Sequence, residues 1–312
     1  MGQLSPLMGL DPTIEKIVSE ISEDKIAETL KKLESFETRN TLSDPNQPYR
    51  GIGARAMAKR LKGRNQKIEA LLNNDIIGSE VRGNGISDNL RVLVFSEDPN
   101  DSPSRQIARY VKRIGERYLP EMTVEMVFRR DRFGRGGDHT AFNQENYAGV
   151  RFTTPNENFS NQHTATDTFA NASPSYAARV TRINAAVAAN MALAPSPPVT
   201  SPSQVAARST QSSGNVTPGR MQSGRRWRGG PGLSRGSGYD AVLRWEYPDA
   251  DPDLAGYVVV VRSTTANDWE REIWVGNVKE FTLKNTPIDE LVFGVKAVDH
   301  DGHESPVSPY AR

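Results

Sequence analysis

Five polar residues between positions 75 and 167 have side chains that can bind a metal ion or transfer a proton. They are Asp75, Asp138, His139, His163 and Asp167. Carboxylates and imidazoles can hold zinc, which accepts nitrogen and oxygen ligands in near-tetrahedral geometry. A metal ion held by such ligands can lower the pKa of a bound water and so supply a nucleophile. The alternative for each residue is structural, because Asp is common in turns and a His in a polar loop is usually just exposed.

The composition limits both the metal chemistry and the partners. The chain has 312 residues and no cysteine, so any metal must be held by His and carboxylate side chains. A net charge of +1 gives no field that would favour nucleic acid. No apolar run is long enough to span a membrane, and the first residues show no signal-peptide pattern.

The elements that must position these residues follow from the pattern of apolar residues. Up to about residue 195, strand-like and helix-like stretches alternate, which predicts an α/β domain with a parallel sheet covered by helices. Asp75 falls at the end of the first strand, and ligands in such sheets collect beyond the carboxyl ends of strands. Strands are expected at 67–77, 90–95, 123–128 and 148–152, and helices after Ser22, at 54–61, after Ser102-Pro103 and after Ser173.

The remainder of the chain has a different character. Residues 196–238 are rich in Ser, Pro, Gly and Arg and are interpreted as a linker. Residues 239–311 contain short strand-like runs separated by turn signals, which is typical of an all-β sandwich.

Four segments of the first domain resemble a known family. They are LNNDIIG around Asp75, DRFGRGGDHTAF at 131–142, GVRFTTPNENFSNQHTATDT at 149–168, and the closing helix SPSYAARVTRINAAVAANMALAP. In order and spacing they resemble the co-catalytic di-zinc aminopeptidases, metallopeptidase family twenty-eight, over residues 10–195. The resemblance implies two zinc ions, peptide or protein substrates, and a location that is extracellular or periplasmic.

The resemblance also implies a role for each of the five polar residues. Asp75 corresponds to a terminal ligand of one zinc and His163 to a terminal ligand of the other. Asp138 and His139 lie in a glycine-rich loop that the family uses near its substrate-binding face, although Asp138 could equally cap a short helix. Asp167 is a candidate to orient His163 from behind, or to cap the turn that follows.

Part of the family pattern is absent from this chain. The family has an upstream His-x-Asp, whose Asp bridges the metals, and a Glu-Glu pair that supplies the general base and a zinc ligand. No His precedes His139, and no Glu-Glu dipeptide occurs. The sequence is therefore interpreted as carrying an internal deletion near 51–57, natural or arising in gene assembly. No catalytic residue is assigned, and we expect weak zinc binding, negligible peptidase activity and a poorly stabilised first domain.

Residues 239–311 resemble a fibronectin type III module. Trp245 in LRWEYP takes the place of the family's core tryptophan, Tyr257 begins the strand GYVVVVR, and VKAVDHDGHESPVS matches the late hairpin. Phe293 stands where a tyrosine-corner residue is usual. The resemblance implies a module that tethers the protein or binds a surface or protein partner.

Three functional hypotheses remain open on the sequence. The first is a zinc exopeptidase that removes N-terminal residues from peptides. The second is a non-catalytic interaction or adhesion protein that uses the fibronectin module. The third is an incomplete sequence of a genuine enzyme, which is favoured because the flanking motifs, with Asp75 and His163, look undamaged.

Overall fold

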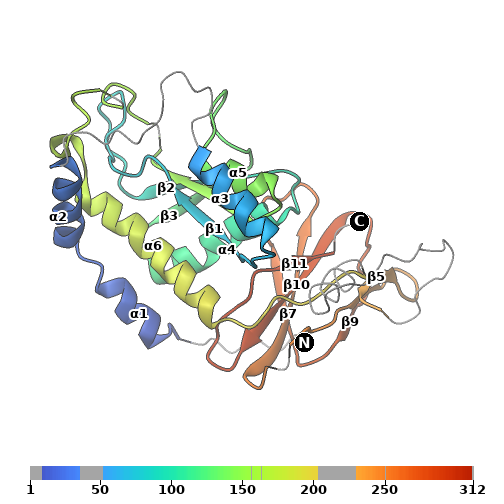
Figure 1. Cartoon of the computed structure of the whole chain (residues 1–312). Helices are drawn as coiled ribbons and strands as arrows, with labels where there is room; N and C mark the ends of the chain where they lie inside the picture. The colour runs from blue at the N-terminus through green and yellow to red at the C-terminus, as the bar shows by residue number, and fades with distance from the viewer. Residues whose placement is uncertain are drawn as a thin grey trace. The chain divides into compact units, whose positions relative to one another are not determined.

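The computed structural model describes residues 9–35, 52–155, 157–162, 164–202, 230–249 and 251–310. The chain divides into two compact units, Leu10–Ala189 and a second that includes Asn190–Arg312. Figure 1 shows the elements of both units. The first contains helices α1 (Pro12–Ser19), α2 (Glu23–Glu34), α3 (Ile52–Gly63), α4 (Pro103–Tyr118), α5 (Asp138–Gln144) and most of α6 (Pro174–Leu193), the turn η1 (Phe169–Asn171), and strands β1 (Leu71–Asn74), β2 (Arg91–Ser96), β3 (Thr123–Val127) and β4 (Gly149–Thr153).

The four strands of the first unit form one mixed sheet in the order β1-β4-β2-β3. Strand β4 is parallel to β1 but antiparallel to β2, and β2 is parallel to β3. The prediction of a parallel sheet is therefore wrong at the β4–β2 pair. The reason lies between β1 and β2, where residues 75–90 form no helix that would return the chain in the parallel sense. The α/β class with helix-covered strands is confirmed.

Helix α4 begins where the sequence predicts it. The Ser102 side chain accepts a hydrogen bond from the backbone amide of Arg105, and Pro103 occupies the first turn. Ile107, Val111 and Ile114 are all buried, so one stripe of the helix faces the core.

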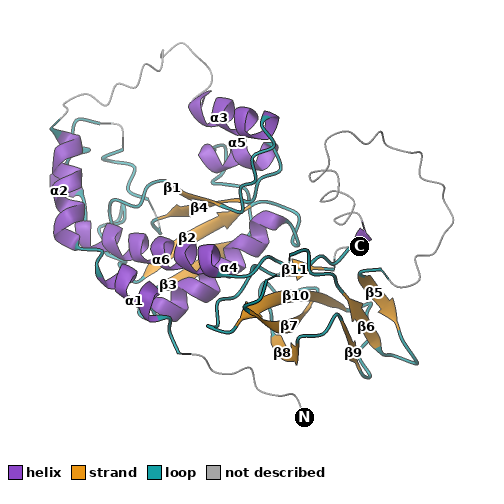
Figure 2. Cartoon of the chain, turned by 60° about the horizontal axis from the view of Figure 1, so that its bottom comes forward, coloured by secondary structure: helices purple, strands orange, loops and turns teal. Residues whose placement is uncertain are grey.

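Helix α6 covers the sheet with a second apolar stripe. Tyr176, Val180 and Ile183 are fully buried, and the Tyr176 hydroxyl donates to the Arg91 carbonyl oxygen at 2.9 Å. A Cβ atom at Gly115 of α4 would lie 2.8 Å from Cγ2 of Ile183, so only glycine allows this close approach. Figure 2 shows α3 and α5 lying together beside β1, which is an edge strand of this sheet. The described helices include none long and apolar enough to cross a membrane.

The second unit contains two antiparallel sheets. One has the order β5-β6-β9 and the other β11-β10-β7-β8. Their facing sides share a core in which Trp245 is 2% exposed and meets the Tyr257 ring edge-on at 5.3 Å. The strands are β5 (Gly232–Arg235), β6 (Ala241–Arg244), β7 (Leu254–Ser263), β8 (Arg271–Gly276), β9 (Glu280–Leu283), β10 (Leu291–Asp299) and β11 (Ser308–Pro309).

Two features of this unit were not expected from the sequence: strand β7 is buried on both faces, and the sandwich begins earlier in the chain. The run Val258–Val261 in β7 is buried on both faces, because Val259 and Val261 enter the core between the sheets while Val258 and Val260 pack with Trp269 and Trp274. Strand β5 lies within 196–238, the range expected to be a linker, and pairs with β6. The sandwich therefore begins before residue 239.

Candidate active site

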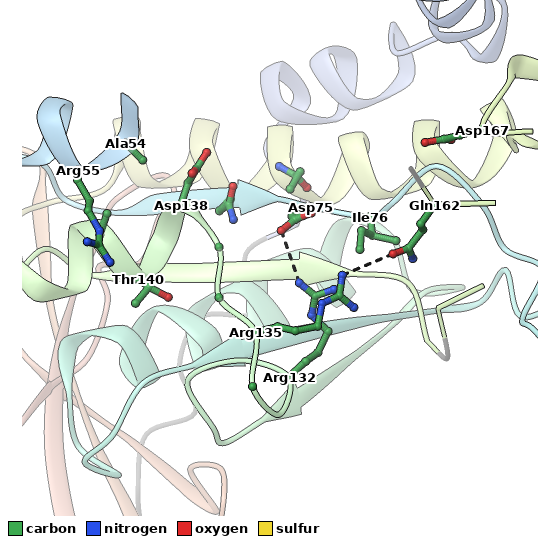
Figure 3. A pocket seen from close by; sticks show the side chains of 16 residues that line it. Ala54, Arg55, Asp75, Ile76, Arg132, Arg135, Asp138, Thr140, Gln162 and Asp167 are labelled. Carbon is green, nitrogen blue, oxygen red and sulfur yellow. Dashed lines mark hydrogen bonds and ion pairs between the residues drawn. The ribbon is translucent and has the colours of Figure 1, made fainter. Parts of the chain in front are cut away.

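Asp75 lies at the carboxyl end of β1, as the sequence predicts. Its backbone amide donates to the Phe152 carbonyl oxygen at 3.1 Å, which continues the β1–β4 ladder by one residue. Its carboxylate lies 3.2 Å from Nη2 of Arg151 and 3.8 Å from Nη2 of Arg132. Figure 3 shows the Asp75 and Arg132 side chains pointing toward each other. The candidate zinc ligand is thus paired with two guanidinium groups.

Arg151 is the centre of a buried ionic network. Its side chain is 0% exposed, rises from the middle of β4, and donates to the carboxylate of Asp131, which is 2% exposed. It also donates to the backbone carbonyl oxygen of Asp75 at 3.3 Å. Burial lowers the pKa of Arg151, although Asp75 and Asp131 oppose that shift. A charge this deeply buried requires such acidic partners.

Asp131 is held in its charged form. Burial alone would raise its pKa, but the backbone N–H of Arg132 at 2.6 Å and the charge of Arg151 outweigh burial and lower the pKa. The Arg132 guanidinium adds a hydrogen bond from Nε at 3.1 Å. These two hydrogen bonds and the one from Arg151 all end on Oδ1, whereas Oδ2 accepts none from the described residues.

Glu157 joins two loops of the site. Its carboxylate is 5% exposed and accepts two hydrogen bonds from Nη1 of Arg132, at 2.7 and 2.8 Å, and one from Arg135 at 2.8 Å. It also lies 3.7 Å from Arg151. These bonds connect the loop that follows β3 with the loop that follows β4, and they fix both beside Asp75.

Asp138 and His139 are adjacent in the sequence, but their side chains lie in different environments. Asp138 is the first residue of α5 and is exposed, and the N-cap position belongs to Gly137, so the interpretation of Asp138 as the cap is wrong. His139 is 0% exposed, and its Nε2 donates to the Arg130 carbonyl oxygen at 2.8 Å. Burial lowers the pKa of His139, which favours the neutral imidazole. His139 is therefore a core residue.

A cavity of about 990 Å³ opens at the ends of β1 and α5. Asp75 and Asp138 both line it, and Asp167 lines it from the segment before η1, where its backbone amide donates to the Thr164 carbonyl oxygen at 3.1 Å. Thr168, not Asp167, occupies the N-cap position of η1. His163 lies outside the described residues. The charged residues that line the cavity are three acids and three arginines: Asp75, Asp138, Asp167, Arg55, Arg132 and Arg135.

The described residues do not fit a pair of zinc ions. Across the described residues, no three His, Asp or Glu side chains are grouped so that they could hold a metal ion. A structural or catalytic zinc normally has three or four protein ligands. Asp75, the one predicted ligand that is described, is engaged by Arg151 and Arg132, and their positive charge opposes a second cation at the same oxygen atoms.

The sequence-based reasoning missed the arginines and their acidic partners. One signal was present, since Arg151 stands inside the apolar strand GVRFT and a charge at such a position requires a buried partner. Asp131 and Glu157 come from two different loops, and nothing in their local sequence pairs them with that strand.

Comparison with known proteins agrees with the resemblance at the level of the family. Residues 51–188 match the profile of peptidase family M28. The chain is 32% identical over 286 residues to a "Probable zinc metalloprotease" of Pyricularia oryzae, covering 82% of this chain and 51% of that protein. It is 30% identical over 281 residues to a second "Probable zinc metalloprotease", from Leptosphaeria maculans, covering 81% of this chain and 58% of that protein. The chain thus spans about half the length of the curated relatives it matches.

The solved structure of the LapA aminopeptidase of Legionella pneumophila is also similar. It shares 18% identity, covers 44% of this chain and 35% of that chain, and gives a TM-score of 0.35, which is too low to define a common fold. The class indicated is an α/β domain with its site at the carboxyl end of a strand. The sequence matches support a more particular assignment, peptidase family M28, for residues 51–188.

Proposed function

We propose that the chain descends from zinc-dependent exopeptidases that hydrolyse N-terminal peptide bonds, and that this polypeptide does not itself catalyse the reaction. The family profile and the zinc metalloprotease relatives support the lineage. The absence of catalysis is supported by one observation: the Asp75 carboxylate is paired with Arg151 and Arg132.

The chemistry of amide hydrolysis supports the proposal that this chain is inactive. Amide hydrolysis at neutral pH needs an activated water and a general base, which typically contributes about 10²–10⁴-fold in rate. Asp131 and Glu157 are 2% and 5% exposed, are held by arginine donors and do not line the cavity, so neither is placed to take a proton from a water beside a bound peptide. The cavity retains space and charge for a peptide, but the described residues include no group of three ligands that could hold a zinc-bound water there.

The test is release of the N-terminal residue from unblocked peptides with added zinc, comparing the wild-type chain with Asp75→Asn. We expect neither chain to exceed the uncatalysed background. Zinc-dependent release by the wild type that is lost in Asp75→Asn would overturn the proposal, because it would make Asp75 a working ligand.

We infer that the lost activity reflects an internal deletion near residues 51–57. The resemblance places the missing His-x-Asp and Glu-Glu segments at this junction, where helix α3 begins at Ile52 before it leads into β1 through residues 64–70. Sequencing the transcript tests the inference. An uninterrupted reading of this junction supports a natural deletion, whereas an intervening segment with those motifs identifies an incomplete sequence of an active enzyme.

The second candidate function is a non-catalytic interaction or adhesion protein. Its support is the second unit, whose three-stranded and four-stranded sheets enclose Trp245 and Tyr257, an arrangement that fits a fibronectin type III module. Such modules and aminopeptidases of this kind favour a location outside the cytoplasm. Fluorescence polarisation with labelled unblocked peptides separates the candidates, since saturable binding without turnover supports the interaction protein and turnover contradicts it.

A further inference from the structure

One Asn-x-Ser/Thr triplet differs from the others in this chain. Four occur in the sequence, and three of them are followed by proline, which confines the preceding Ser or Thr to extended backbone. Asn158-Phe159-Ser160 is followed by Asn161 and carries no such restriction. The triplets followed by proline begin at Asn100, Asn171 and Asn215.

The triplet at Asn158 is open at the surface. Phe159 is 65% exposed and Ser160 is also exposed. The Asn158 side-chain oxygen accepts a hydrogen bond from the Ser160 backbone amide at 3.0 Å, which makes an Asx turn. Within the described part of the chain, this leaves the Asn158 Nδ2 and the Ser160 hydroxyl without a hydrogen-bond partner. The Ser160 hydroxyl is therefore exposed, and the half-buried Asn158 keeps its Nδ2 free of described hydrogen bonds.

The other two described triplets have their hydroxyls occupied. Ser102 caps α4, is 8% exposed, and donates from its hydroxyl to the Glu97 carbonyl oxygen at 2.6 Å. The Ser173 hydroxyl donates to the Glu80 carboxylate at 2.9 Å. These contacts belong to the folded first unit, so a bulky group nearby would disturb them.

We propose that Asn158 is an acceptor for an N-linked oligosaccharide. This rests on the extracellular location suggested under the proposed function. The Asn158 Nδ2 would form a bond to the anomeric carbon of a lipid-diphosphate-linked oligosaccharide, losing one proton while the lipid diphosphate leaves. The acceptor loop is anchored by Glu157, so the attachment does not require the loop to leave its arginine partners.

An oligosaccharide on Asn158 would lie beside the cavity and limit access to it. Arg135 lines the cavity and its guanidinium lies 5.3 Å from the centre of the Phe159 ring, so the triplet stands at the cavity rim. A glycan on Asn158 would cover the exposed Phe159 ring. It would also narrow the approach to the cavity, admitting flexible chain ends in preference to folded proteins.

The test is translation of the full chain behind a cleavable heterologous leader in the presence of endoplasmic-reticulum microsomes. We expect an endoglycosidase-sensitive shift of one glycan that is lost in Asn158→Gln and kept in Ser160→Thr. The matched control, Asn100→Gln/Asn171→Gln/Asn215→Gln, should keep the shift. Because the leader is supplied, the result does not depend on natural secretion or on peptidase activity. No shift in the wild type, while a control glycoprotein shifts, or a full shift in Asn158→Gln, overturns the proposal.

Discussion

Replacing Arg151 with Met should destabilise the first unit strongly and leave the stability of the second unit unchanged. The side chain of Arg151 is 0% exposed and forms ion pairs with Asp75 and with Asp131, which is 2% exposed. Removing one partner of a buried ion pair costs about 3–5 kcal/mol, because the other charge remains buried. Asp131 keeps its two hydrogen bonds from Arg132, so we expect the lower end, about 3 kcal/mol.

Urea unfolding followed by far-ultraviolet circular dichroism measures this loss, since the described α-helices lie largely in the first unit. With a slope of about 2 kcal/mol per molar urea, the midpoint should fall by about 1.5 M. Tryptophan fluorescence reports on the other unit, where Trp245, Trp269 and Trp274 lie.

Two further variants test the cause. The double variant Arg151→Met/Asp131→Asn should lose less unfolding free energy than the two single variants lose together. The reason is that it leaves no buried carboxylate without its arginine partner. Arg151→Lys keeps the charge but loses the forked geometry, and should fall between the wild type and Arg151→Met. An Arg151→Met chain within 0.5 kcal/mol of the wild type, roughly the scatter of neutral surface substitutions, would refute the buried-network account.

The remaining predictions concern stability. Burial lowers the pKa of His139 from 6.5, so its stabilising effect is complete above that pH and declines as the pH falls toward the folded-state pKa. The unfolding free energy of the wild type minus that of His139→Gln should therefore fall below about pH 6.5, by up to ~1.4 kcal/mol per pH unit, and a level difference would contradict this. Gly115→Ala should cost about 1–3 kcal/mol by circular dichroism, because its Cβ would lie 2.8 Å from Ile183, and an unchanged midpoint would show that the helices separate freely. Trp245→Ala should cost about 3–5 kcal/mol in the second unit, monitored by the remaining tryptophans, and a loss under about 1 kcal/mol would mean that its contact with Tyr257 is not part of a packed core.

The sequence predicted the local elements better than their assembly. Ser102-Pro103 and the stripe of α4 are local signals, and the structure has that helix where they place it. The direction of β4 relative to β2 depends on how the chain returns from β1, which no local pattern encodes. The charged network likewise unites Arg151, Asp131 and Glu157 from separate segments, so it could only be recognised once they were brought together.

The candidate site shows the same division. Asp75 lies at a strand end, and Asp138 and Asp167 line the same cavity, which the order of the motifs indicated. His139 was expected on that face and is instead buried, because α5 turns its imidazole toward the Arg130 carbonyl oxygen. Adjacent residues at the start of a helix point in different directions, so a motif alone could not separate Asp138 from His139.

The most direct test of the central claim is the zinc content of the purified full chain after equilibrium dialysis against micromolar zinc, measured by inductively coupled plasma mass spectrometry beside Asp75→Asn. We predict well below one tightly held zinc per chain and no difference between the two proteins. Two zinc ions per wild-type chain, reduced in Asp75→Asn, would contradict the claim that Asp75, paired with Arg151 and Arg132, does not hold zinc.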